Sequence, residues 1–179
     1  MDEDQIHVAV SNDGTKIAGR VQGQGAPIVL VHGGLGDGEV SWFFMLPFLV
    51  EHFACFLMST RGRGLSGDNT DHTRQRQFED VATFVASIGE PVGVFGHSSG
   101  AVWALGGAAL CPNRVRALAL YEPPIDPELL IRAKAAGLDL EDVLADRFAP
   151  LPHYRFQILL QKANEFCSEV RSLGGDILS

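Results

Sequence analysis

The sequence predicts an α/β protein with a mainly parallel, doubly wound sheet and a helical lid. Three observations carry this prediction. Apolar runs alternate with segments of helical periodicity over residues 27–121, as parallel strands joined by crossover helices do. The runs are nearly continuous, which is typical of strands buried on both faces of a sheet. Glycine-rich segments follow several runs, where the carboxyl ends of parallel strands form ligand sites.

The sheet is expected to begin with a hairpin. Residues 6–10 and 16–21 alternate apolar and polar side chains on either side of Asn12-Asp13-Gly14, a strong signal for two strands and a tight turn. The apolar runs at 27–31 and 53–59 then predict the first two buried strands.

Three helices are expected between and after the buried strands. Ser41 is predicted to cap a helix over 42–50, which Pro47 shortens or kinks. A helix over 99–110 precedes the last predicted strand at 115–121. Another helix begins at residue 73, and four residues spaced i, i+3, i+4 and i+7 mark its buried face: Val81, Phe84, Val85 and Ile88.

The pattern changes after residue 121. Asp126-Pro127-Glu128 is a good helix start, and apolar residues recur on one face over 156–173. We therefore predict an α/β core over residues 1–123 and a helical lid over residues 124–179.

The stretch 92–100 predicts a sharp turn from a strand into a helix. Ser98 is the central residue of a G-x-S-x-G pentapeptide, and the turn leaves almost no room for side chains two positions away, where Gly96 and Gly100 stand. The turn exposes the Ser98 hydroxyl, and the Ser99 N–H at the helix N-terminus can stabilise an oxyanion. Ser98 is the candidate nucleophile, and Ser99 is the first candidate oxyanion-hole donor.

Two further glycine-rich loops lie at the same end of the predicted sheet. The first, at residues 32–38, provides the Gly34 N–H as the candidate second oxyanion donor; the alternative is a turn that needs glycine only for its shape. In the second, at residues 60–67, we expect Arg61 and Arg63 to tie the loop together rather than to bind an anion. Glu79 and Asp80 are expected to be solvated or bound to this arginine loop.

The amino-acid composition limits the kinds of molecule that the chain is expected to bind. Fourteen Lys and Arg against 22 Asp and Glu give a net charge of −8, which argues against nucleic-acid and anionic-membrane surfaces and favours a small-molecule partner. An acidic N-terminus and the lack of an apolar run of bilayer length predict a cytoplasmic protein. The three cysteines have no C-x-x-C spacing, so we expect no metal and no cofactor.

Over residues 6–125 these motifs resemble the α/β-hydrolase superfamily. Residues 32–34 are similar to its oxyanion loop, residues 61–66 to its Arg-Gly-x-Gly-x-Ser turn, and residues 96–100 to its nucleophile elbow. The ending Tyr121-Glu122-Pro123-Pro124 resembles a branch of small-molecule hydrolases that carry a helical cap. The family usually has an aspartate where this chain has Ser59, which predicts some loss of order in the arginine loop.

The resemblance implies a serine hydrolase that acts on a small ester, lactone or related acyl substrate through a Ser98 acyl-enzyme. Members that are haloalkane dehalogenases or epoxide hydrolases place an aspartate at the elbow, so a serine favours ester-type chemistry or cofactor-free perhydrolysis. Glu122 stands where some members carry the acid of the triad. Holding the cap loop by hydrogen bonds is an equal alternative for Glu122.

The base is the least determined group. The family's triad histidine follows the final strand, and we expect this chain to lack the last strand and helix units, which leaves the strand at 115–121 as an exposed edge. His153 is the only histidine after Ser98, and it is the candidate base, with a solvated or capping role as the alternative. His97 is expected to point into the fold and His32 to shape the oxyanion loop.

Because the base is undetermined, the sequence also allows a second function. The chain would be a catalytically incomplete hydrolase-like protein or fragment that binds small molecules or needs a partner chain. A homodimer that completes the sheet in trans is the form of partner that an unpaired edge strand suggests.

Overall fold

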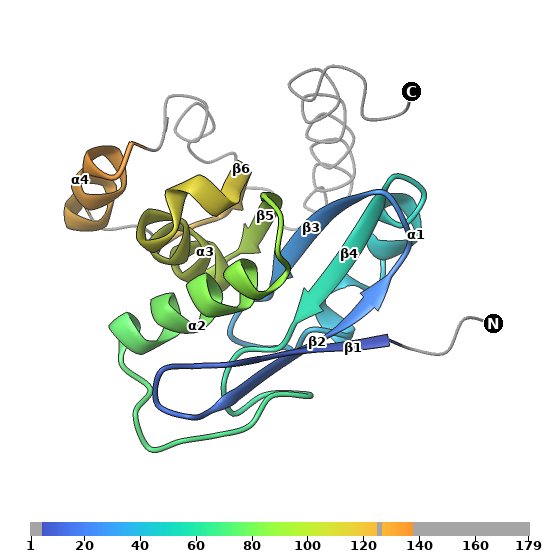
Figure 1. Ribbon diagram of the computed structural model, residues 1–179, viewed down its shortest axis with the longest axis horizontal. Coiled ribbons are helices and arrows are strands. Elements are labelled where there is room, and N and C mark those ends of the chain that lie inside the picture. Colours follow the sequence, from blue (N-terminus) through green and yellow to red (C-terminus); the bar gives the residue numbers. More distant parts are fainter. Residues whose placement is uncertain (1–4, 125–126, 138–179) are drawn as a thin grey trace.

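The computed structural model describes residues 5–124 and 127–137, and these residues form one six-stranded sheet with helices on both faces (Figure 1). The spatial order is β1-β2-β4-β3-β5-β6, with β4, β3, β5 and β6 parallel and with β1 and β2 antiparallel to their neighbours. The predicted mainly parallel sheet with a leading hairpin is confirmed. The strands are β1 (Gln5–Val10), β2 (Lys16–Gln22), β3 (Ala26–Val31), β4 (Phe53–Met58), β5 (Val92–His97) and β6 (Val115–Tyr121).

Strand β3 lies between β4 and β5, in the middle of the sheet, and both of its faces are buried. Ile28 and Leu30 pack against α1 (Leu46–Leu49) and the segment before it, whereas Val29 and Val31 pack against α2 (Arg74–Ser87) and α3 (Ser99–Leu110). All four side chains are almost completely buried. A strand covered on both faces has no polar side to show, which explains its continuous apolar run.

The predicted helix over 42–50 is two short pieces, the 3-10 turn η1 (Val40–Trp42) and α1. Pro47 lies in the first turn of α1, where a missing N–H costs no hydrogen bond. The predicted cap at Ser41 is wrong, because Ser41 lies inside η1. Asp37 holds the start of this segment instead, since its Oδ1 accepts the N–H groups of Glu39 and Val40, each at 2.9 Å.

Helices α2 and α3 pack closely because α3 has two glycines at their contact. A Cβ on Gly106 would lie 2.2 Å from the Phe78 ring, and one on Gly107 would lie 2.6 Å from Val81 Cγ1. Thr73 caps α2, accepting the Arg76 N–H. The close contact places α3 directly over β3 and β5, so that the N-terminus of α3 stands at the carboxyl end of the sheet.

Helix α4 (Pro127–Ala135) begins where the sequence predicts and packs on α3 through Leu129 and Ala133. The 3-10 turn η2 (Pro112–Arg114) joins α3 to β6. The predicted boundary at residue 124 stays a prediction, and the remainder of the predicted lid, including the helix at 156–173, lies outside the described residues.

Strand β6 stands at one end of the sheet order and pairs with β5; within the described residues no strand lies on its other side. Its side chains are mostly half-buried.

Among the described residues, no helix has the length and apolar character needed to span a membrane.

Candidate active site

Ser98 occupies a sharp turn between β5 and α3. Its backbone has φ of 53° and ψ of −124°, a left-handed conformation that a side chain rarely adopts. A Cβ on Gly96 would lie 2.5 Å from Ala101 Cα, and a Cβ on Gly100 would lie 2.2 Å from the His32 carbonyl oxygen. Because the obstructing atoms are backbone, they cannot move aside, and both positions require glycine.

The glycine-rich loop after β3 lies against this turn. A Cβ on Gly33 would stand 3.2 Å from Ser98 Cβ, and one on Gly34 would stand 3.5 Å from Ser99 Oγ. Ser99 is the first residue of α3, so its N–H is one of the donors that a helix leaves without an internal partner. The structure thus brings together Ser98, Ser99 and Gly34, three of the five candidate site residues.

Both ring nitrogens of His32 form hydrogen bonds with the loops that follow β3 and β4. The Thr60 N–H donates to His32 Nε2 at 3.1 Å, so Nε2 is an acceptor, and Nδ1 donates to the Gly33 carbonyl oxygen at 2.7 Å. The side chain is buried, and burial lowers the pKa of His32. The ring is therefore neutral with its proton on Nδ1, and the expectation that His32 shapes the glycine-rich loop after β3 is confirmed.

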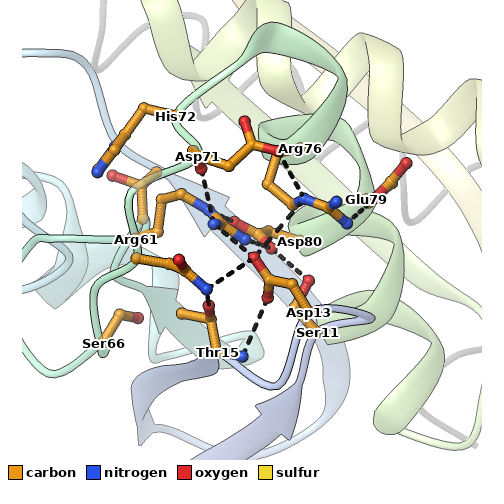
Figure 2. A network of polar contacts seen from close by, with 12 residues as sticks. Ser11, Asp13, Thr15, Arg61, Ser66, Asp71, His72, Arg76, Glu79 and Asp80 are labelled. Carbon is orange, nitrogen blue, oxygen red and sulfur yellow. Dashed lines mark hydrogen bonds and ion pairs between the residues drawn. The ribbon is translucent and has the colours of Figure 1, made fainter.

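Arg61 is the centre of a buried polar network (Figure 2). Its Nε and Nη2 donate to both carboxylate oxygens of Asp80 at 2.6 and 2.7 Å, and Nη1 donates to Asp13 Oδ2 and to the Asp71 carbonyl. The side chains of Arg61 and Asp80 are wholly inaccessible. The hydrogen bond to Asp80 raises the pKa of Arg61, and the hydrogen bond from Arg61 lowers the pKa of Asp13.

The network joins the β1-β2 turn, the loop after β4 and helix α2, which fixes the arginine loop. All three guanidinium nitrogens are engaged by protein groups. The prediction that Arg61 ties the loop together is confirmed, and Asp80 is bound to it rather than solvated. Ser11 adds a further bond, donating to Asp80 Oδ1 at 2.6 Å.

The expected loss of order at Ser59 is wrong. Its hydroxyl accepts the Leu65 N–H at 3.3 Å, and its carbonyl accepts the Ser66 hydroxyl at 2.6 Å. Ser66 Oγ in turn accepts the Ala18 N–H from β2 at 2.9 Å. The two Ser59 oxygens thus hold the turn closed.

Glu122 lies beside the elbow, and His97 faces it. The Ser98 N–H donates to the Tyr121 carbonyl at 2.8 Å, which brings the end of β6 against the turn. His97 Nε2 is 3.9 Å from Glu122 Oε2, and the His97 side chain is 36% exposed. The prediction that His97 points into the fold is therefore wrong.

Sequence reasoning missed this pair although a signal was present. Histidine and glutamate end two neighbouring parallel strands, and the register that sets His97 opposite Tyr121 places Glu122 one residue further on. Such strand ends meet at the same edge of a sheet. His153, the candidate base, lies outside the described residues.

A cavity of about 340 Å³ lies between α1 and strands β2 and β4, apart from the elbow. Its walls are mostly apolar, with a salt bridge between Arg20 and Glu39. The residues that line the cavity are Arg20, Gln22, Glu39, Phe43, Leu46, Pro47, Val50 and Leu57.

In the part of the chain that the structure describes, no three metal-ligating side chains gather at one place.

Three known proteins are similar to this chain. An N-formylmaleamate deformylase from Pseudomonas putida is 31% identical over 109 residues, which are 59% of this chain and 40% of that protein. The crystal structure of an esterase from Rhodococcus sp. ECU1013 is 28% identical with a TM-score of 0.60, covering 66% of this chain and 46% of the other. The bottromycin epimerase BotH, solved with bottromycin A2, is 29% identical with a TM-score of 0.59, covering 65% and 47%.

The matches thus span less than half of each of these proteins. The alpha/beta hydrolase family matches residues 28–174, which include the oxyanion loop, the arginine loop and the elbow. Sheet order, the positive φ of Ser98 and the loop against it agree with that match. The chain belongs to the alpha/beta hydrolase family.

Proposed function

We propose that this chain carries the nucleophile of a serine hydrolase that acts on a small ester, lactone or related acyl substrate. One observation carries the proposal: Ser98 is held in a left-handed turn, with the N-terminus of α3 on one side and the glycine loop on the other. Strain of this kind persists where the surrounding structure enforces it, and it gathers at functional sites.

In the proposed reaction, Ser98 Oγ attacks the substrate carbonyl as a histidine removes its proton. The N–H groups of Ser99 and Gly34 donate to the oxyanion of the tetrahedral intermediate. The leaving alcohol takes the proton from the histidine, and water then hydrolyses the acyl-serine by the same steps. Glu122 orients the histidine as the acid of the triad, and His153 is the candidate for that histidine.

Two of the similar proteins, a deformylase and an esterase, support acyl chemistry. Exposed apolar side chains in and after the oxyanion loop support a substrate with an apolar part. Leu35 is fully exposed, and Phe43 and Phe44 are 70% and 63% exposed. Such side chains lose water favourably when an apolar ligand covers them.

The test is labelling with a fluorophosphonate probe, read by intact mass. The probe reacts with an activated serine, so we expect one adduct on the wild type and none on Ser98→Ala. Ser41→Ala, at a serine outside the elbow, serves as the control and should be labelled like the wild type. His153→Ala should lose labelling if His153 is the base. A folded wild type that takes no label, or a Ser98→Ala variant that keeps it, contradicts the proposal.

A second candidate is a chain that binds a small molecule but does not turn it over alone. Two observations favour it: His32 is a neutral loop residue rather than a base, and one structural relative is titled an epimerase rather than a hydrolase. The same fold supports different chemistry in different members. A homodimer joined at β6 would complete the sheet in trans; a dimer in sedimentation, with labelling that rises with protein concentration, supports it.

A further inference from the structure

The end of β6 carries a second strained residue next to Ser98. Glu122 has φ of 48°, and among the described residues other than glycine only Ser98 shares a positive φ. The two turns are joined, because the Ser98 N–H donates to the carbonyl of Tyr121, the residue before Glu122. A strained conformation is kept where neighbouring contacts over-determine it. The turn at Glu122 is thus built onto the elbow.

The ring of His97 lies between β6 and the oxyanion loop. It is 5.5 Å from the Tyr121 ring at an interplanar angle of 32°, and a Cβ on Gly33 would lie 3.3 Å from its Nδ1. From this confined position Nε2 faces Glu122 Oε2 at 3.9 Å, an ion-pair distance. Two further neighbours of the ring, Tyr121 and Gly33, carry no charge near neutral pH.

Folding stability does not account for this pair. The two side chains are 36% and 39% exposed, and ion pairs this exposed contribute little to the stability of a protein. Their location is what distinguishes them, since His97 directly precedes the nucleophile and Glu122 ends the neighbouring strand. An arrangement that adds little stability, and in which Glu122 itself has an unfavourable positive φ, points to a role at the site.

We propose that His97 is a positioning residue whose imidazole holds the Glu122 carboxylate in place beside Ser98. A carboxylate fixed in this way presents its oxygens to the catalytic histidine in one geometry, and small displacements of such groups lower rates strongly. The positioning role rests on the proposed function, whereas the His97–Glu122 pair itself does not.

The first experiment tests the pair without using activity. The pH titration of the histidine rings is followed by NMR in the wild type and in Glu122→Gln, with His97→Gln identifying the His97 signals among the six histidines. A nearby carboxylate favours the charged imidazole, so the His97 midpoint should move to lower pH in Glu122→Gln. His72, paired with Asp68 at 2.9 Å on the surface, is the internal control and should not move. An unchanged His97 midpoint overturns the pair.

The second experiment tests positioning through the rate of fluorophosphonate labelling between about pH 5 and pH 9. His97→Gln should label roughly 10- to 100-fold more slowly with a changed pH profile, and the double variant with Glu122→Gln should label no more slowly than Glu122→Gln alone. His72→Gln should match the wild type. If His97→Gln labels at the wild-type rate and profile, positioning is wrong while the serine hydrolase stands; a folded wild type that takes no label overturns both roles, and the NMR titration still decides the pair.

Discussion

Single residues at the elbow are fixed by backbone contacts rather than by side-chain packing. Gly100 stands where β3 and α3 approach each other, and a Cβ there would meet the carbonyl oxygens of Val31 and His32 at 2.3 and 2.2 Å. A side chain at the edge of a core can rotate away from a new methyl group, but these carbonyls belong to the sheet and the oxyanion loop. Even the smallest side chain would therefore push α3 away from the end of β3.

We expect Gly100→Ala to lower the free energy of unfolding by at least about 2 kcal/mol, because overpacking against backbone forces the elements apart. Gly34→Ala is the matched control: its Cβ would lie 3.5 Å from Ser99 Oγ, an ordinary contact, and its φ is not positive. Urea unfolding of the two variants checks the difference. Equal unfolding midpoints would show that the loop and α3 separate more easily than this contact allows.

At the scale of elements, one buried arginine side chain holds together three segments that are distant in the sequence. Arg61 follows β4, Asp80 lies in α2, and Asp13 lies in the turn between β1 and β2. A buried ion pair gives little net stability compared with apolar residues of the same shape, yet the loss of one partner is costly because a charge is left unpaired in the interior.

Asp80→Asn is therefore expected to lower the free energy of unfolding by about 3 to 5 kcal/mol. Its neighbour Glu79, which forms a partly exposed pair with Arg76, provides the control, and Glu79→Gln should cost less than about 1 kcal/mol. Thermal or urea unfolding measures both. Similar losses in the two variants would mean that water reaches Arg61 and that the network is not a buried one.

The sequence predicted most elements because local patterns and packing agree in them. Apolar runs, the Thr73 start of α2 and the elbow glycines each have one structure that satisfies them. The misses have different causes: Asp37, three residues before Val40, holds the segment before α1 in place of Ser41, and His97 faces Glu122, which follows the neighbouring strand. The register of β5 and β6 sets that last pair, and register emerges only once the strands are assembled.

The whole molecule should lose stability in acid in two separate steps. The upper step belongs mainly to the buried His32 and in smaller part to the more exposed His7, because burial lowers the pKa of both. A lowered folded-state pKa means that the unfolded chain binds more protons, so the stability is complete above the unfolded value of about 6.5 and falls as the pH drops below it. Protonation of Nε2 would also set an N–H against the Thr60 N–H.

The lower step belongs to three aspartate carboxylates in loops, those of Asp13, Asp37 and Asp71. Backbone N–H groups of Val40 and Thr73 lower the pKa values of Asp37 and Asp71, and the hydrogen bond from Arg61 lowers the pKa of Asp13. Their contribution is complete above the unfolded pKa of about 3.9 and is lost as the pH falls toward the lowered folded values. The sign is the same as for His32, but the pH range lies about two to three units lower.

Urea unfolding midpoints between about pH 8 and pH 3 separate the two steps. The wild type should decline once below about pH 6.5 and again below about pH 4. His32→Gln should make the first decline shallower, leaving the part that His7 contributes, and should keep the second. Asp71→Asn, which retains an oxygen for the Thr73 N–H but does not titrate, should make the second decline shallower and keep the first. Each variant is thus the control for the other, and a single decline that both variants alter alike would contradict the assignment of the steps to separate groups.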